Sequence, residues 1–445
     1  MQEEATAVDG GLVGLCVSMC VQVRRQRRQR CRMSGSSQSR SYVHVSHDHR
    51  ACLRLPITGR AELHFVVEAQ ALDFCHGSAG GGTFALQTAG AKVVGGCEIN
   101  RARFELYQAL HGHGTECMDA VECANRICTQ VAMMLLCGPC QCFIALGGQA
   151  PDGGQDEREC VQPVVKSIST LSKNRRPVTL VMENVLQMMT VEGGNFFGRV
   201  ADELHTAGYH LAIVVMYADA FGLPIRRKRL YVAALPSDIA VQRFVWHMQT
   251  SDVCSKTVFA DVCEKDPALW DDDELRIDVD VMRRALRRSS LGWFTIVSCH
   301  YQGILQTLIT RGGETHCLGY GTYVVWTNDD EQYRKNTVPF EDLSVGNWKI
   351  RTLSCREVCK LQGSPVDTTF VHGEGKTAHI AWGEAVAVPC AKTVCNAALQ
   401  ATGHLGLQRP QSTPDDIQHN HQWPCTTQTV GIKHPRKVVM LHCKT

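Results

Sequence analysis

The stretch LDFCHGSAGGG, Leu72–Gly82, decides the fold that we expect for this chain of 445 residues. An apolar run of strand length leads directly into a glycine-rich turn, and residues 83–90, TFALQTAG, continue as a helix. Glycine lets the backbone approach a bound nucleotide-like molecule closely, and the N-terminus of the next helix faces the same place. The stretch therefore predicts the first strand, turn and helix of a ligand-binding α/β domain.

The same alternation continues along the chain, where short apolar runs are separated by segments of helical spacing. Residues 195–208 space Phe196, Val200 and Leu204 as one helical face, and residues 100–112 have a similar pattern. The apolar runs cover residues 68–74, 91–99, 131–136, 178–184, 211–217 and 229–235. Such alternation predicts an α/β fold with a Rossmann-like, doubly wound, mostly parallel sheet.

The composition is that of an ordinary soluble globular chain, with 44% hydrophobic and 20% charged residues. The net charge of +2 excludes a polycation, so contacts with nucleic acid must come from local patches. No apolar run of roughly 18 residues occurs, and we expect no membrane span. The 23 cysteines suit a reduced intracellular protein. One C-x-x-C, from Cys137 to Cys140, has no second pair beside it, so we expect no metal.

Both ends of the chain differ from its middle. Residues 1–60 carry ten arginines against four acids, and we expect residues 1–62 to form a disordered basic tail. This tail would be a nuclear-import signal, an arm that contacts phosphates or simply a solvated segment. We therefore expect the protein to be nuclear if its source is eukaryotic, and cytoplasmic or associated with the nucleoid otherwise. Residues 403–445, rich in Gln, His, Pro and Thr, are predicted to be a loose tail.

Acidic residues follow two further predicted strands. Glu98 ends the strand after the glycine turn, where a carboxylate can hold ribose hydroxyls, and Asp119 ends an expected third strand, where it could accept from an adenine amino group. No G-K-[ST] phosphate loop is present. Each feature alone would be a turn or a solvated acid. Together they favour an adenosine-type pocket.

Three cysteines crowd around one proline in LLCGPCQCFIALGG, Leu135–Gly148, and could be metal ligands, a redox pair or one nucleophile with two bystanders. A proline-tightened turn at the carboxyl edge of a sheet suits a nucleophile, here Cys140. The next strand ends in Glu183, which we expect to be partly desolvated and a candidate proton donor to a ring nitrogen. Arg227 and Arg229 follow at i, i+2 and can point to one face, towards a polar base or a phosphate.

The order of these motifs resembles that of the cytosine-5 DNA methyltransferases, from about Ala71 to Leu399. Any single match is modest, but eight in the right order are specific. The matching segments are DFCHGSAGG (73–81), CEIN (97–100), CGPCQCF (137–143), ENV (183–185), FGLPIRRKR (221–229), QTLITRGG (306–313), RTLSCREVCKLQGSP (351–365) and WGEAVAVPCAKTV (382–394).

The resemblance implies a class I methyltransferase fold in residues 63–235 and 349–402, with a smaller target-recognition region in residues 236–348. It implies S-adenosylmethionine as cofactor and double-stranded DNA as partner, and we expect a monomer. Within the smaller region we expect the acidic run 261–280 to be a solvated loop. The basic run RRALRR, 283–288, is either a phosphate contact or an exposed helix face.

The resemblance also implies roles for single residues. Cys140 would attack C6 of a cytosine rotated out of the duplex, Glu183 would hold or protonate N3, Arg229 would bind O2, and Arg227 would contact the backbone of the flipped nucleotide. Substrate-positioning residues would be Pro139, Gln141 and Asn184. The cofactor pocket would be formed by Phe74, Gly77, Gly80, Glu98, Asp119, Gly383 and Val386.

The chain departs from the family pattern at several positions. An extra residue in the first motif leaves open whether Phe74 or Cys75 takes the aromatic position. Cys137 begins the cysteine motif in place of glycine, Ile225 replaces glutamine, and Glu384 replaces the asparagine of the last motif, which brings a carboxylate near the cofactor. Because Cys140 and its charged partners are intact, we expect activity.

Three other functions stay open. A transfer-RNA cytosine methyltransferase would use the same residues, but that branch typically carries a C-F-T tripeptide in its recognition region, which is absent here. A catalytically silent DNA-binding regulator is favoured by Glu384 and Ile225 and opposed by the intact Cys140. A thiol oxidoreductase using Cys137 and Cys140 would leave the acidic residues and the arginine pair unexplained.

Overall fold

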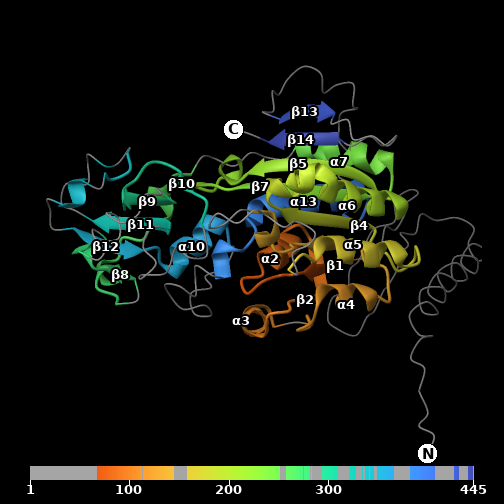
Figure 1. Cartoon of the computed structure of the whole chain (residues 1–445), viewed down its shortest axis with the longest axis horizontal. Helices are drawn as coiled ribbons and strands as arrows, with labels where there is room; N and C mark the ends of the chain where they lie inside the picture. The colour runs from red at the N-terminus through yellow and green to blue at the C-terminus, as the bar shows by residue number, and fades with distance from the viewer. Residues whose placement is uncertain are drawn as a thin grey trace, which may run out of the picture. The chain divides into compact units, whose positions relative to one another are not determined.

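The computed structural model describes the chain from residue 68 to residue 443 with gaps (Figure 1). The described residues are 68–112, 114–144, 158–250, 257–273, 275–280, 282, 293–308, 320–326, 333, 336–339, 341–344, 348–364, 381–405, 425–429 and 439–443. The predicted basic tail and the run 283–288 lie outside the described residues.

An eight-stranded sheet organises most of these residues, in the order β13-β14-β5-β7-β4-β3-β1-β2. Its strands are β1 (Ala69–Phe74), β2 (Ala91–Cys97), β3 (Met133–Leu136), β4 (Thr179–Asn184), β5 (His210–Tyr217), β7 (Lys228–Leu235), β13 (Cys425–Thr429) and β14 (Val439–Cys443). Six of these fall on the six predicted apolar runs. Neighbours pair in parallel except at β7, which runs antiparallel to β4 and β5, and in the β13–β14 hairpin. The predicted doubly wound, mostly parallel sheet is confirmed.

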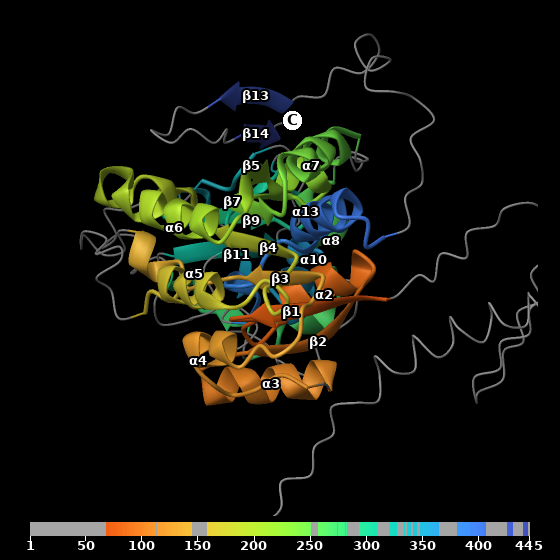
Figure 2. The ribbon, with the colours of Figure 1, turned by 90° about the vertical axis from the view of Figure 1, so that its right-hand side faces the viewer.

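Helices cover both faces of this sheet, as Figure 2 shows. One face packs against α2 (Gly81–Thr88), α7 (Asp238–Thr250) and α13 (Val388–Ala401). The other packs against α4 (Ala120–Asn125), α5 (Val161–Thr170) and α6 (Asn195–Thr206). Helix α13 begins within the last motif, residues 382–394, and packs against α2, which follows the glycine turn. This packing brings the last motif to the glycine turn. Helix α3 (Arg101–His111) follows β2.

A second, four-stranded sheet has the order β8-β12-β11-β9 and its own hydrophobic core. Its strands are β8 (Arg276–Ile277), β9 (Trp293–Ser298), β11 (Tyr320–Trp326) and β12 (Lys349–Thr352). Strand β12 pairs with β11 and β8 in this sheet and begins at residue 349, next to the boundary expected from the sequence. A short pair, β6 (Ile225–Arg226) with β10 (Leu305–Gln306), links the two parts of the chain.

The remaining described helices are short. They are α8 (Phe259–Val262), α10 (Cys355–Gln362), η1 (Gln141–Phe143), η3 (Leu186–Met189), η4 (Val191–Gly194), η5 (Ala218–Phe221), η6 (Pro267–Trp270) and η9 (Glu341–Ser344). Over the described residues, no helix combines the length and the apolar character that a bilayer crossing requires.

Two segments differ from the sequence expectations. The strand that Asp119 was expected to end is reduced to a single parallel bridge between Cys97 and Glu116. Asp119 instead caps α4, because its Oδ1 accepts bonds from the backbone N–H groups of Val121 and Glu122. Within residues 403–445, where the sequence indicated a loose tail, β13 and β14 extend the large sheet beside β5.

Candidate active site

The turn that carries Cys140 is fastened to the neighbouring strand. Asn184, the last residue of β4, donates from Nδ2 to the carbonyl of Gly138 at 3.1 Å and accepts from the N–H of Val185 at 2.8 Å. A Cβ at position 138 would lie 2.6 Å from Cγ2 of Val161, so a larger residue there would require Val161 to shift. Cys140 follows at the carboxyl end of β3 and precedes η1.

Four charged side chains act on the Cys140 thiol. Burial raises the pKa of this thiol, Arg229 and Arg227 oppose the rise, and Glu183 and Glu384 add to it. Arg229 Nε lies 3.2 Å from Glu183 Oε1, and both side chains are mostly buried. The thiol is thus protonated at neutral pH in this state, with two cations placed to favour its ionisation.

Arg227 has a different environment from that expected of a residue that contacts nucleic acid. It is only 2% exposed, and burial lowers the pKa of its guanidinium to about 10. Its Nη1 donates to the carbonyl of Gly383 at 3.1 Å, and its Nη2 donates to that of Ala385 at 2.6 Å. In this state Arg227 holds the last motif beside the cysteine turn, and it does not face outward towards a nucleotide backbone.

The glycine turn lies beside Glu98, just after β2. The two carboxylate oxygens of Glu98 accept bonds from the backbone N–H groups of Gly77, at 3.1 Å, and Asn100, at 2.9 Å. Gly80 has φ of +59° and would place a Cβ 2.2 Å from Nε2 of His111, so both backbone and space require glycine. These bonds fix the Glu98 carboxylate at the turn.

The last motif packs onto this turn. A Cβ at Gly81 would lie 3.1 Å from the carbonyl oxygen of Val386. Next to it, Glu384 forms an ion pair with Arg103 of α3, with Nη2 and Oε2 2.6 Å apart. Burial raises the pKa of Glu384, and the negative charge of Glu98 raises it further, whereas Arg103 opposes both effects. The unusual carboxylate at position 384 therefore has a matching cation. Arg103 carries no family motif, and sequence reasoning missed it.

Other predicted pocket residues are arranged differently. Phe74 is fully buried and packs in the core on the face of α4, α5 and α6. Cys75, the alternative, has φ of +58° and bonds through its N–H to the carbonyl of Cys97. Beside the turn, the ring of His76 stacks on Tyr107 of α3 with centroids 3.6 Å apart, and both side chains are buried. Sequence reasoning missed this pair too.

The remaining predicted residues surround the nucleophile. Pro139 and Gln141 flank Cys140 and are half-buried. Burial raises the pKa of Cys137, which, like Cys140, is a free thiol. Within the described part of the chain, no group of three or more metal-ligating side chains is arranged to hold an ion.

Comparison with known proteins gives three kinds of match. The family profile described as "C-5 cytosine-specific DNA methylase" matches residues 70–400. Among curated relatives, the type II methyltransferase M.BsuFI of Bacillus subtilis is 27% identical over 59% of this chain and 57% of its own length. M.HhaI of Haemophilus parahaemolyticus is 26% identical over 37% of this chain and 49% of its own length. The chain thus spans about half the length of these relatives.

Solved structures support the fold. The methyltransferase EhMeth of Entamoeba histolytica has a TM-score of 0.57 at 14% identity, covering 75% of this chain and 98% of its own. The Dnmt2 methyltransferase of S. pombe has a TM-score of 0.53 at 18% identity, covering 74% and 98%. The fold and the profile match over 70–400 agree, and the chain belongs to the C-5 cytosine-specific DNA methylase family.

Proposed function

We propose that this protein transfers a methyl group from S-adenosylmethionine to C5 of cytosine in double-stranded DNA. The observation that carries the proposal is the meeting of Cys140, Glu183 and Arg229 at the ends of three adjacent strands of one sheet. A thiol beside a paired carboxyl group and guanidinium matches the ring of a cytosine, which offers an electrophilic C6, a basic N3 and an accepting O2.

The reaction would begin with the Cys140 sulfur. Its thiolate forms a bond to C6 of a cytosine rotated out of the duplex, while Glu183 supplies a proton to N3 and Arg229 donates to O2. The electron pair that becomes available at C5 takes up a methyl group, for which bound S-adenosylmethionine is the source. Loss of the C5 proton to water then restores the C5–C6 double bond, expels the Cys140 thiolate and returns the N3 proton to Glu183.

The residues around the glycine turn fit the cofactor. The Glu98 carboxylate would hold ribose hydroxyls, the open space at Gly77 would let the backbone approach the cofactor, and Gly80 allows the turn to pack against His111. Both capping bonds of Asp119 end on Oδ1, so its Oδ2 can accept from an adenine amino group. We assign Phe74 a supporting place within the core.

Gly383 and Val386 would complete the pocket from the last motif. Beside them, the Arg103–Glu384 pair presents a cation and an anion next to each other. We propose that this pair holds the amino-acid end of the cofactor, with Arg103 at the carboxylate and Glu384 at the ammonium group.

The direct test is methyl transfer from tritiated S-adenosylmethionine to DNA and, in parallel, to transfer RNA, followed by nucleoside analysis. We expect labelled 5-methyl-2′-deoxycytidine from DNA, no label with Cys140→Ser, and retained transfer with Cys137→Ser. Label in transfer RNA alone would move the assignment to the RNA branch. Cofactor binding without transfer to either polymer would favour the silent regulator.

A further inference from the structure

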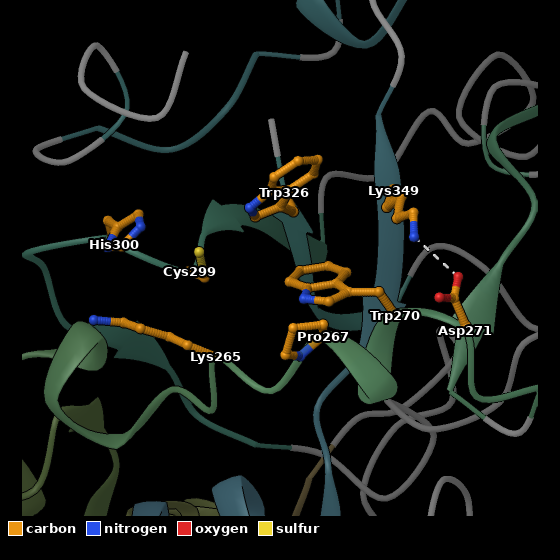
Figure 3. Close-up of a pocket in the computed structure, with 8 residues that line it drawn as sticks. All are labelled: Lys265, Pro267, Trp270, Asp271, Cys299, His300, Trp326 and Lys349. Atoms are coloured by element: carbon orange, nitrogen blue, oxygen red, sulfur yellow. Dashed lines mark hydrogen bonds and ion pairs between the residues drawn. The ribbon is translucent and has the colours of Figure 1, made fainter. Parts of the chain in front are cut away.

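A cavity of about 220 Å³ lies in the smaller region, lined by residues none of which belongs to the proposed active site (Figure 3). It is bordered by η6 and by the ends of three strands of the four-stranded sheet. The lining residues are Lys265, Pro267, Trp270, Asp271, Cys299, His300, Trp326 and Lys349. Pockets that enclose a whole drug-sized ligand hold roughly 300–1,000 Å³, so this one suits a single ring system.

Two tryptophans from separate elements provide its aromatic surface. Trp270, at the end of η6, is 6% exposed, and the guanidinium carbon of Arg351 lies 4.7 Å from its ring centroid. Arg351 is itself fully buried and bonded to Glu357 at 2.7 and 2.8 Å, so one face of the Trp270 ring rests on a fixed cation. Trp326, at the end of β11, is 39% exposed, and Figure 3 shows both rings at the open space.

The charges around the cavity favour an anionic ligand. Figure 3 shows Lys265 and His300 at one end of the cavity, and the Lys349–Asp271 pair at the other. Lys349 Nζ lies 2.9 Å from Asp271 Oδ1, so the one carboxylate among the lining residues is already matched by a cation. Lys265 would repel an ammonium or methylammonium group, which argues against a modified lysine peptide. An aromatic ring attached to a phosphate satisfies both the indoles and the lysine.

We propose that the Trp270–Trp326 pocket binds one unpaired nucleotide of a nucleic-acid strand, with its base against the indoles and its phosphate near Lys265. A base inside a duplex hides both faces in the stack, so the occupant must be single-stranded or extrahelical. The pocket would thus hold an unstacked nucleotide at a place separate from Cys140. The inference extends the proposed function but does not depend on methyl transfer.

The test measures binding by fluorescence anisotropy with the full chain, over one series of salt concentrations that is the same for every variant and probe. The probes are a labelled single-stranded DNA 12-mer, the RNA of the same sequence and the blunt DNA duplex. Removing one stacking indole weakens single-strand binding about five- to 150-fold, so Trp326→Ala should lose affinity in this range for single strands and less than about twofold for the duplex. Lys265→Gln should lower single-strand affinity and flatten its salt dependence.

Trp326 is the residue to change because it is partly exposed, whereas truncating Trp270 would uncover buried Arg351 and risk unfolding. Trp246→Ala, on α7, removes a half-buried tryptophan outside the cavity and serves as the matched control. The DNA and RNA arms decide which strand the pocket takes. Equal losses for single strands and duplex, no loss with Trp326→Ala, or Trp326-dependent binding of a trimethyllysine peptide instead would overturn the proposal. Methyl transfer is scored separately, so either idea can fail alone.

Discussion

The Arg103–Glu384 ion pair provides a quantitative test of the proposed cofactor pocket. The Glu384 carboxylate raises the pKa of Cys140, and Glu98 in turn raises the pKa of Glu384. Glu384 also lies in the segment that packs on the glycine turn. In the proposed pocket, the cofactor would extend from a ribose at Glu98 to a methyl group near Cys140. Its amino-acid end would then lie within reach of the Arg103–Glu384 pair.

The expected magnitude follows from the burial of the pair. A hydrogen bond to a charged group contributes about 1.5–3 kcal/mol. The side chains of Arg103 and Glu384 are 33% and 25% exposed, so solvent screens them and the lower end applies. Arg103→Met should therefore weaken binding of the amino-acid end by about 1.5 kcal/mol, roughly tenfold in Kd. Glu384→Gln should weaken it by a similar or smaller factor, because an amide still accepts from the ammonium group.

The assay is isothermal titration calorimetry with two ligands. S-adenosylhomocysteine carries the amino-acid end, and 5′-deoxy-5′-methylthioadenosine has the same adenosine and sulfur without it. Arg103→Met should lose about tenfold for the first ligand and less than about twofold for the second. The matched control is Arg101→Met, which removes an exposed ion pair with Glu105 from the same helix and should change neither. Equal losses for both ligands, or none, would refute the reasoning.

Three other changes have defined outcomes. Arg229→Gln removes a cation that favours the Cys140 thiolate, so the pKa of the thiol should rise and its iodoacetamide alkylation should shift to higher pH. Burial raises the pKa of Asp73 from 3.8 to about 7, so the native state keeps this proton and becomes less stable as the pH rises from about 4 to about 7. Asp73→Asn should therefore raise the free energy of unfolding by up to about 4 kcal/mol at pH 8 and by far less at pH 5. Arg351→Met leaves the fully buried Glu357 charge unpaired and should cost about 3–5 kcal/mol in urea unfolding, more than the double variant Arg351→Met/Glu357→Leu.

Matched variants separate these effects from general damage. Lys228→Gln removes the positive charge that precedes Arg229 in the sequence. Because the Lys228 ammonium group lies over the Tyr217 ring, this change should leave the alkylation profile of Cys140 unchanged. Glu105→Gln removes an exposed carboxylate and should add no pH-dependent stability. An unshifted profile for Arg229→Gln, a pH-independent gain for Asp73→Asn, or a double variant as unstable as Arg351→Met would each contradict the corresponding argument.

The sequence predicted the large sheet well because its signal is local. Buried parallel strands are continuous apolar runs, and each of the six predicted runs became a strand. The prediction that Asp119 ends a strand was wrong because the residues before it form only a single bridge. In sequence, an aspartate that caps a helix cannot be distinguished from one that ends a strand. The strand at 425–429, CTTQT, was missed because its polar composition resembles that of a tail. The strand at 439–443, VMLHC, is a short apolar run beyond this polar stretch, and its pairing partner β5 is far away in sequence.

For the site, motif order located Cys140, Glu183 and Arg229, which the structure brings together. Arg227 donates hydrogen bonds to the carbonyls of Gly383 and Ala385, which lie far from it in the sequence. No local sequence pattern indicates this contact. The same holds for Arg103, whose importance appears only when α3 and the last motif meet. Contacts between distant segments are therefore what the sequence leaves out.

The central claim, that Cys140 is the nucleophile that attacks cytosine, is tested most directly by covalent trapping. The protein is incubated with S-adenosylmethionine and DNA containing 5-fluorocytosine, whose C5 cannot lose a proton, and denatured complexes are separated and mapped by peptide mass spectrometry. We expect a methylated adduct on Cys140 that is absent in Cys140→Ser and present in Cys137→Ser. An adduct on another cysteine, or one that survives Cys140→Ser, would contradict it.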